Sequence, residues 1–333
     1  MKTTLGAFGN EGSEGSEGSE GSEGSEGSVA GTASVSGLGA YSGNLTSPLL
    51  ADALWRTHAE LTRSYPGPNA PKDETTLAPV AWDGALPRWS RDVRIQLYTF
   101  DLVSGLQFDT SSPDDATLKD ATGTKICTLS RPLLDRPTPG PKPSAELEAA
   151  VLHVIKMSAL RAERMNEILT QVAIPYSFFA MVLNLQPGRD RWTFELLASA
   201  MQLSGLAVMQ FKHHFRVRRP ADRSALVQPV LLTPGHGSFP AGHSTQCHFL
   251  ATVLKDLCKD RRGGDAADQL DALADRIGEN RVVAGLHYKE DIAAGAILGK
   301  KLGDYFLRKA RPMGAQPTPL QWLWKNADSE PWV

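Results

Sequence analysis

The chain has 333 residues, of which 41% are hydrophobic and 22% are charged. This composition excludes wholesale disorder, a collagen-like fibre and a membrane-dominated chain. The formal net charge is only −2, so the sequence predicts no nucleic-acid binder. Three cysteines, Cys127, Cys247 and Cys258, form no Cys-x-x-Cys pair. This pattern argues against a disulfide scaffold or a thiolate zinc site and favours a reducing compartment.

The N-terminal region has low sequence complexity. Residues 11–28 repeat Glu-Gly-Ser six times, and small polar residues follow. Because such a segment has little to bury, we predict a solvated tail over residues 1–45 and one helical domain over residues 46–333. Lys2 is not followed by an apolar stretch. No secretory signal is therefore predicted, and the expected location is cytoplasmic.

Helical periodicity dominates the remaining sequence. Pro-rich residues 66–88 predict a loop, and residues 104–146, rich in Asp, Thr, Ser and Pro, predict a long irregular excursion. Apolar spacing predicts helices over residues 144–185, 193–215, 242–260, 266–284 and 286–308. Strand patterns are nearly absent, so the predicted fold class is all-α, a helical bundle whose core spans residues 144–310. The most apolar stretch, residues 196–211, is short and contains two Gln residues, so no membrane span is predicted.

Three short segments carry side chains that suggest chemistry. They are KHHFRVRRP over Lys212–Pro220, HGSFPAGH over His236–His243, and RVVAGLHYKED over Arg281–Asp291. Lys212, Arg219 and Arg281 are cations, and the two Arg are forked hydrogen-bond donors. Together they suit a tetrahedral oxyanion such as phosphate, sulfate or vanadate.

The two histidines of these segments have different surroundings. His243 is expected in the first turn of a helix, where backbone N–H groups and Gly242 favour the close approach of an anion. His287 and Asp291 are four residues apart and would share one face of a helix. Asp291 can then accept the Nδ1–H of His287 and direct a basic Nε2 at a metal or electrophilic centre.

These segments resemble the signature of the phosphatidic acid phosphatase type 2 / vanadium-dependent haloperoxidase superfamily. Its pattern is K-x6-R-P, then P-S-G-H, then S-R-x5-H-x3-D, and the chain matches this order between Lys212 and Asp291. Asn280 replaces a Ser of the pattern, which is a minor change. The resemblance covers about 80 residues directly and implies the helical bundle of the superfamily.

A second departure from the pattern concerns the oxyanion directly. Ala241 stands where the superfamily has the Ser of P-S-G-H, whose hydroxyl bonds an equatorial oxygen of the anion. Losing one such bond costs about 1.5–3 kcal/mol of anion binding. Either the site is weaker, or Ser238, Ser244 or a water replaces the bond.

The resemblance implies an enzyme with one of two activities. In a haloperoxidase, vanadate is the cofactor without haem, His287 is its metal ligand, and hydrogen peroxide oxidises halide to a hypohalous-acid-type halogenating species. The oxyanion-binding residues are then Lys212, Arg219, Gly242, His243 and Arg281. In a phosphatase, His287 becomes a phosphohistidine and His243 protonates the leaving alcohol. A non-catalytic oxyanion-binding protein is the third hypothesis.

Three features favour the haloperoxidase. The sequence predicts neither a membrane span nor a signal, and about 200 residues precede the motifs. His236 lies five residues before Ala241. In the haloperoxidases that the chain resembles, this position lines the halide side of vanadate, and a His there is similar to the bromoperoxidases. The predicted catalytic residues are therefore His236, His243, His287 and Asp291. The expected partners are hydrogen peroxide, bromide or iodide, and a small organic substrate, and the long apolar helices favour a homo-oligomer.

Overall fold

The computed structural model describes residues 52, 55–57, 82–136, 143–173, 175–259, 263–312 and 316–331. These residues fall into two units, one within Ile95–Val333 and one within Ser28–Arg94. The predicted tail over residues 1–45 and its boundary with the following domain lie outside the described residues.

The unit within Ser28–Arg94 contains short helical elements. Helix α2, Trp82–Ala85, continues into the 3-10 turn η4, Leu86–Arg88. The Arg94 guanidinium, in the first turn of the next helix, donates to the backbone oxygens of Leu86 and Trp89. The loop predicted over residues 66–88 therefore ends in a helical turn.

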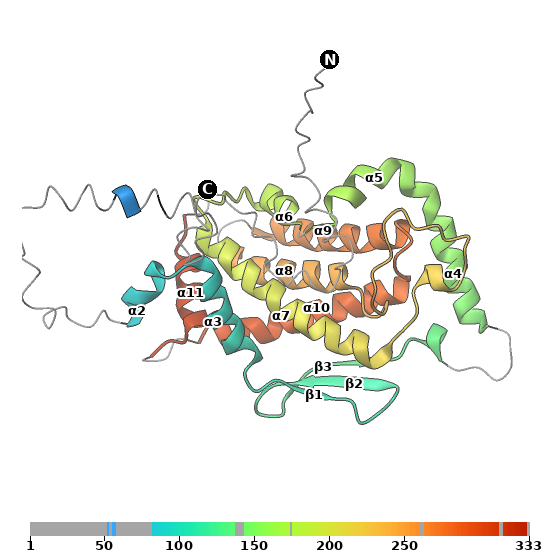
Figure 1. Ribbon diagram of the computed structural model, residues 1–333, viewed down its shortest axis with the longest axis horizontal. Coiled ribbons are helices and arrows are strands. Elements are labelled where there is room, and N and C mark those ends of the chain that lie inside the picture. The colour runs from blue at the N-terminus through green and yellow to red at the C-terminus, as the bar shows by residue number, and fades with distance from the viewer. Residues whose placement is uncertain are drawn as a thin grey trace, which may run out of the picture. The chain divides into compact units, whose positions relative to one another are not determined.

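The unit within Ile95–Val333 is a bundle of helices with a small sheet at one edge (Figure 1). Its helices are α3 Arg91–Val103, α4 Ala145–Met157, α5 Arg161–Thr170, α6 Tyr176–Leu183, α7 Arg191–Phe215, α8 Gly242–Cys258, α9 Gly263–Val283, α10 Lys289–Ala310 and α11 Pro319–Asp328. Helix α8 packs against α7, α9 and α10 and buries nearly all of its side chains. The predicted all-α fold class is confirmed for the described residues, apart from the sheet.

Helices α8 and α10 lie unusually close because α10 presents glycines to α8. Gly295, Gly299 and Gly303 are four residues apart and share one face of α10. A Cβ atom at Gly295 would lie 2.7 Å from the backbone oxygen of Ala241, and one at Gly299 would lie 2.2 Å from that of Thr245. This contact holds the start of α8 against the start of α10. The second motif ends in the first turn of α8, and the third motif ends in the first turn of α10.

Helices α3 and α11 lie outside the predicted helices, and the boundaries of the predicted ones agree with the structure to within about three residues except at two places. The single helix predicted over residues 144–185 is three helices, because the 3-10 turn Ser158–Leu160 separates α4 from α5 and Pro175 precedes α6. The helix predicted from residue 286 begins at Lys289. Gly285 has φ +87° just before it, a conformation that ends the preceding helix.

The irregular excursion predicted over residues 104–146 is wrong in its first part. Strands β1 Gln107–Asp109, β2 Asp115–Lys119 and β3 Lys125–Ser130 form an antiparallel sheet in the order β1-β2-β3. In β2, buried Ala116 and Leu118 alternate with more exposed polar residues. The Asp, Thr and Ser residues that predict a loop are therefore the turns and outward faces of hairpins.

An ion pair joins α5 to α9 near the site described below. The Glu167 carboxylate accepts from the Arg276 guanidinium at 2.7 and 2.9 Å and from the Asn280 side-chain amide at 2.9 Å. The Arg276 hydrogen bonds lower the pKa of Glu167 from 4.5 to about 2. Its ionised form therefore stabilises the fold.

We expect the Glu167→Gln variant to lose less stability than the wild type between pH 7 and pH 3. A carboxyl group whose pKa is lowered on folding stabilises the protein above its unfolded pKa, and this contribution disappears as the pH falls towards about 2. Because about a third of the side chain is exposed, the effect is at most about 1 kcal/mol. Urea unfolding at both pH values measures it, with Glu163→Gln, a more exposed residue of the same helix, as control. Equal acid sensitivity of both variants and the wild type would contradict this role.

Candidate oxyanion site

The loop between α7 and α8 is the meeting point of the three motifs. The Ser238 amide donates to the backbone oxygen of Val217 at 2.8 Å, and the Ala241 amide donates to that of Asp291 at 3.0 Å. These bonds join the loop to the segment after α7 on one side and to the start of α10 on the other. The two bonds join residues that are 21 and 50 positions apart in the sequence (238 − 217 and 291 − 241).

Lys212 enters the site from the last turn of α7 and is 1% exposed. Its ammonium nitrogen Nζ donates to the backbone oxygens of Gly237 at 2.8 Å and Ser238 at 3.0 Å. Carbonyl oxygens orient an ammonium group but carry no formal charge. The loop therefore holds a positive charge at a fixed place inside the protein.

Arg219 links the second motif to the third and is 2% exposed. Its Nε donates to the backbone oxygen of His236 at 3.1 Å, and its NH1 donates to that of Leu286 at 3.0 Å. The same NH1 lies 3.4 Å from Nε2 of His287, and NH2 lies 3.3 Å from Nδ1 of His236. Two of the predicted histidines thus border one guanidinium.

His287 and Asp291 are hydrogen bonded, but not as two residues on one helical face. His287 lies in the turn before α10, and Asp291 caps that helix by accepting the Tyr288 amide at 3.0 Å. The capping carboxylate oxygen Oδ2 lies 3.0 Å from Nδ1 of His287 and also accepts the Ser238 hydroxyl at 2.5 Å. Both His287 and Asp291 are fully buried. The cap therefore orients the imidazole and turns its Nε2 towards Arg219.

His243 and Arg281 are attached to the carboxyl end of α5. His243 lies in the first turn of α8, and its Nε2 is 2.8 Å from the backbone oxygen of Gln171. The Arg281 guanidinium donates to the backbone oxygen of Ile168 at 3.1 Å. Carbonyl groups at the end of a helix carry partial negative charge and orient such donors. Helix α5 thus positions two of the predicted residues.

A hollow of about 660 Å³ gives access to this region from the side of α7. Its lining includes Lys212, His213, His236 and the exposed Arg216 and Arg218. Both Lys212 and His236 also belong to the hydrogen-bonded network. The hollow therefore opens onto Lys212 and His236 from the surface of the protein.

Two residues hold other residues of the site in place, and the sequence analysis does not predict this role for either of them. Gln171 is 1% exposed, and its side-chain oxygen accepts from Asn280 at 2.9 Å. Nothing in the local sequence marks Gln171, because its partners lie about 70 and 109 residues away. Ser238 donates to Asp291, and its position within the second motif is the sequence signal that indicates it.

The hydroxyl groups expected to compensate for Ala241 have other partners. Ser238 donates to Asp291, and Ser244 donates to the backbone oxygen of Ile292 at 2.7 Å. Ala241 is fully buried at the N-cap position of α8. The place of the superfamily Ser is thus not filled by either of these hydroxyls in the observed arrangement.

We expect Ala241→Ser to tighten the binding of orthovanadate or phosphate by about tenfold, because one hydrogen bond to a charged group is regained. A serine also suits the N-cap position. Titration calorimetry measures the affinity, and Ala266→Ser, a buried alanine of α9, is the control. Unchanged affinity in Ala241→Ser would mean that another donor already fills this place.

Comparison with known proteins gives similar solved structures but no similar sequence. No family model matches the chain, and neither does any curated protein. One similar structure is the first bacterial vanadium-dependent iodoperoxidase, at 19% identity and a TM-score of 0.38, covering 54% of this chain and 53% of that one. Another is a transmembrane PAP2-type phosphatidylglycerolphosphate phosphatase from Bacillus subtilis, at 19% identity and a TM-score of 0.39, covering 48% of this chain and 84% of that one.

The chain thus spans about half the length of the iodoperoxidase. The printed names of these two proteins, a vanadium-dependent iodoperoxidase and a PAP2-type phosphatase, are those of the two activities that the resemblance of the motifs implies. At these TM-scores, any activity has to follow from the chain's own residues.

The predicted cytoplasmic location is wrong. Among the described residues, the helical segment Arg191–Asp222 is long and apolar enough, by length and composition, to cross a membrane, and one of the similar structures is a transmembrane protein. The most apolar window of this segment is 67% buried inside the protein. The prediction of no membrane span rests on residues 196–211 alone, and these lie within the longer helical segment Arg191–Asp222.

Proposed function

We propose that the chain is a vanadate-dependent haloperoxidase that oxidises bromide or iodide with hydrogen peroxide to a hypohalous-acid-type halogenating species. One observation carries this proposal. Nδ1 of His287 lies 3.0 Å from the Asp291 carboxylate, while Nε2 lies 3.4 Å from the Arg219 guanidinium. An imidazole with an oriented lone pair beside a buried cation suits an anion that also needs one nitrogen ligand.

The residues fit an anionic metal oxide better than a metal cation. Within the part of the chain that the structure describes, no three His, Cys, Asp or Glu side chains are grouped to hold a metal ion. In our proposal His287 is the single ligand to vanadium, and Lys212, Arg219 and Arg281 neutralise the vanadate oxygens. Bound vanadate would supply Lewis-acid activation of hydrogen peroxide.

The protein's own contribution is a preorganised electrostatic environment. Backbone oxygens hold Lys212 and Arg219 in place before an anion arrives, so little reorganisation is needed on binding. Asp291 keeps the proton of His287 on Nδ1, which leaves Nε2 as the basic atom.

His243 is suited to move a proton at one defined atom. Because its Nε2 donates to the Gln171 backbone oxygen at 2.8 Å, Nδ1 carries the lone pair. We therefore assign Nδ1 of His243 as the atom that accepts and releases a proton during the reaction. His236, which borders both Arg219 and the 660 Å³ hollow, lies on the proposed halide side.

A phosphatase is the second candidate, and the His287–Asp291 pair supports it as well. The Nε2 lone pair would attack the phosphorus of a phosphomonoester, the P–O bond would break, and His243 would protonate the departing alcohol. Water would then hydrolyse the phosphohistidine and release phosphate. Phosphate and vanadate share a tetrahedral shape, so the same cations serve both.

One pair of assays tests the two activities. We expect orthovanadate-dependent bromination of a phenol dye in the presence of peroxide and bromide, and inhibition by excess phosphate. Hydrolysis of para-nitrophenyl phosphate without bromination at any pH would reverse the order of the two functions. Loss of both activities with retained phosphate binding would indicate a non-catalytic oxyanion-binding protein.

A further inference from the structure

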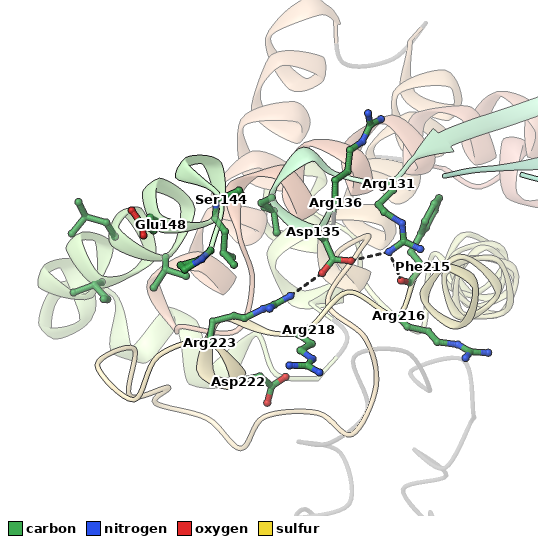
Figure 2. Close-up of a pocket in the computed structure, with 16 residues that line it drawn as sticks. Arg131, Asp135, Arg136, Ser144, Glu148, Phe215, Arg216, Arg218, Asp222 and Arg223 are labelled. Atoms are coloured by element: carbon green, nitrogen blue, oxygen red, sulfur yellow. Dashed lines mark hydrogen bonds and ion pairs between the residues drawn. The ribbon is translucent and has the colours of Figure 1, made fainter. Parts of the chain in front are cut away.

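A second cavity, of about 910 Å³, lies outside the network of His287 and Asp291 (Figure 2). It is formed by the segment after β3, by helix α4 and by the segment that follows α7. Its volume falls within the range of cavities that bind organic molecules. The oxyanion chemistry proposed above does not use it.

One wall of this cavity is aliphatic. Leu147, Val151 and Ile155 of α4 are spaced by four residues and therefore face the same way. Leu152, which is 50% exposed, extends this wall to the surface. A wall of this kind binds an apolar chain by removing it from water.

The remaining lining is strongly basic, with five arginines against three acidic residues. Arg131 and Arg223 both bind the Asp135 carboxylate, at 2.8 and 2.9 Å, and Figure 2 shows both guanidinium groups directed at it. Among the described residues, no carboxylate forms an ion pair with the exposed Arg218. The lining thus keeps a positive excess after its internal pairs are formed.

We propose that this cavity binds an amphiphilic organic anion, namely a carboxylate that carries an apolar chain. The chain lies along Leu147, Val151 and Leu152, and the carboxylate pairs with Arg218. An uncharged apolar molecule would form no ion pair with Arg218, and a small anion would leave the aliphatic wall exposed to water. The two walls together therefore select a molecule with both parts.

The lining of the cavity does not include His287 or Asp291, but it shares Arg216, Arg218 and Asp222 with the 660 Å³ hollow that opens onto Lys212. Asp222 lines the cavity and accepts the backbone amide of Arg219 at 3.0 Å. Phe215 also lines it and packs edge-on against Phe239 of the α7–α8 loop, with ring centres 5.3 Å apart. A ligand in the cavity thus lies behind the loop that orients Lys212, without contact with His287.

Titration calorimetry of the full chain with sodium decanoate tests this proposal. We expect decanoate to bind at least about tenfold more tightly than butyrate, because of its longer chain, and more tightly than decanol, because of its charge. Equal binding of decanol would overturn the assignment of an anionic ligand. Equal binding of butyrate would overturn the assignment of an apolar chain.

Two pairs of variants locate the binding. Leu152→Asp should weaken decanoate binding about tenfold or more, whereas Leu169→Asp, at a leucine of α5 with 49% exposure outside the cavity, should not. Arg218→Gln should weaken it about tenfold, and Arg88→Gln, which removes the same charge elsewhere, should not. Absent decanoate binding, or equal effects of variants and controls, would overturn the proposal.

Vanadate affinity, measured on the same samples, separates this proposal from the haloperoxidase assignment. It should be unchanged in Leu152→Asp. A chain that binds decanoate but not vanadate would refute the haloperoxidase alone, and a chain that binds vanadate but not decanoate would refute the amphiphile site alone.

Discussion

Replacing His287 with alanine is expected to abolish both vanadate-dependent bromination and phosphate transfer, by a factor of at least about 10³. The substitution removes the imidazole whose Nε2 lies 3.4 Å from the Arg219 guanidinium. Asp291 keeps the Tyr288 amide and the Ser238 hydroxyl as partners, so the fold should persist. Dye bromination and vanadate titration measure the loss, and circular dichroism confirms the fold.

A buried histidine of α8 is the matched control for this substitution. His248 is 1% exposed, and its Nδ1 lies 2.8 Å from the Ser244 backbone oxygen. His248→Ala should lower stability to a similar extent but retain activity. Turnover that survives in His287→Ala would remove this residue from the mechanism. Loss of activity in both variants alike would show that the effect comes from the fold.

The second large effect is expected from Gly299→Ala, which should destabilise the fold by about 3 kcal/mol or more. The added Cβ would lie 2.2 Å from the Thr245 backbone oxygen and 3.0 Å from the Phe249 amide nitrogen. Backbone atoms on two packed helices cannot rotate away, so α8 and α10 must separate. Urea unfolding measures the change in the free energy of unfolding.

The Gly299→Ala substitution should also weaken anion binding at the oxyanion site. The start of α8 is bonded to α10 through the Ala241 amide and the Asp291 backbone oxygen, so a displaced helix should also weaken vanadate binding. Gly188→Ala is the control, because a Cβ at Gly188 would meet no atom within 4 Å. Equal stability of the two variants would mean that α8 and α10 adjust without cost.

Much of the helical architecture could be predicted from local sequence. Apolar residues at helical spacing predict α7, α8 and α9, and these helices pack in the bundle, where α8 contacts both α7 and α9. The three motifs also indicate residue types suited to an oxyanion. The sheet escaped prediction because its strands are short and half exposed, and its polar turns dominate the composition.

The sequence by itself determined which side chains are available and which segments are helical, since both depend on residue type and local spacing. Only the tertiary structure decided how His287 is held, because Asp291 acts as a helix cap and Ser238 joins it from another segment. It also decided that Gln171 supports His243. Such contacts join residues far apart in the chain, and their geometry depends on how closely α8 and α10 pack, which local periodicity does not encode.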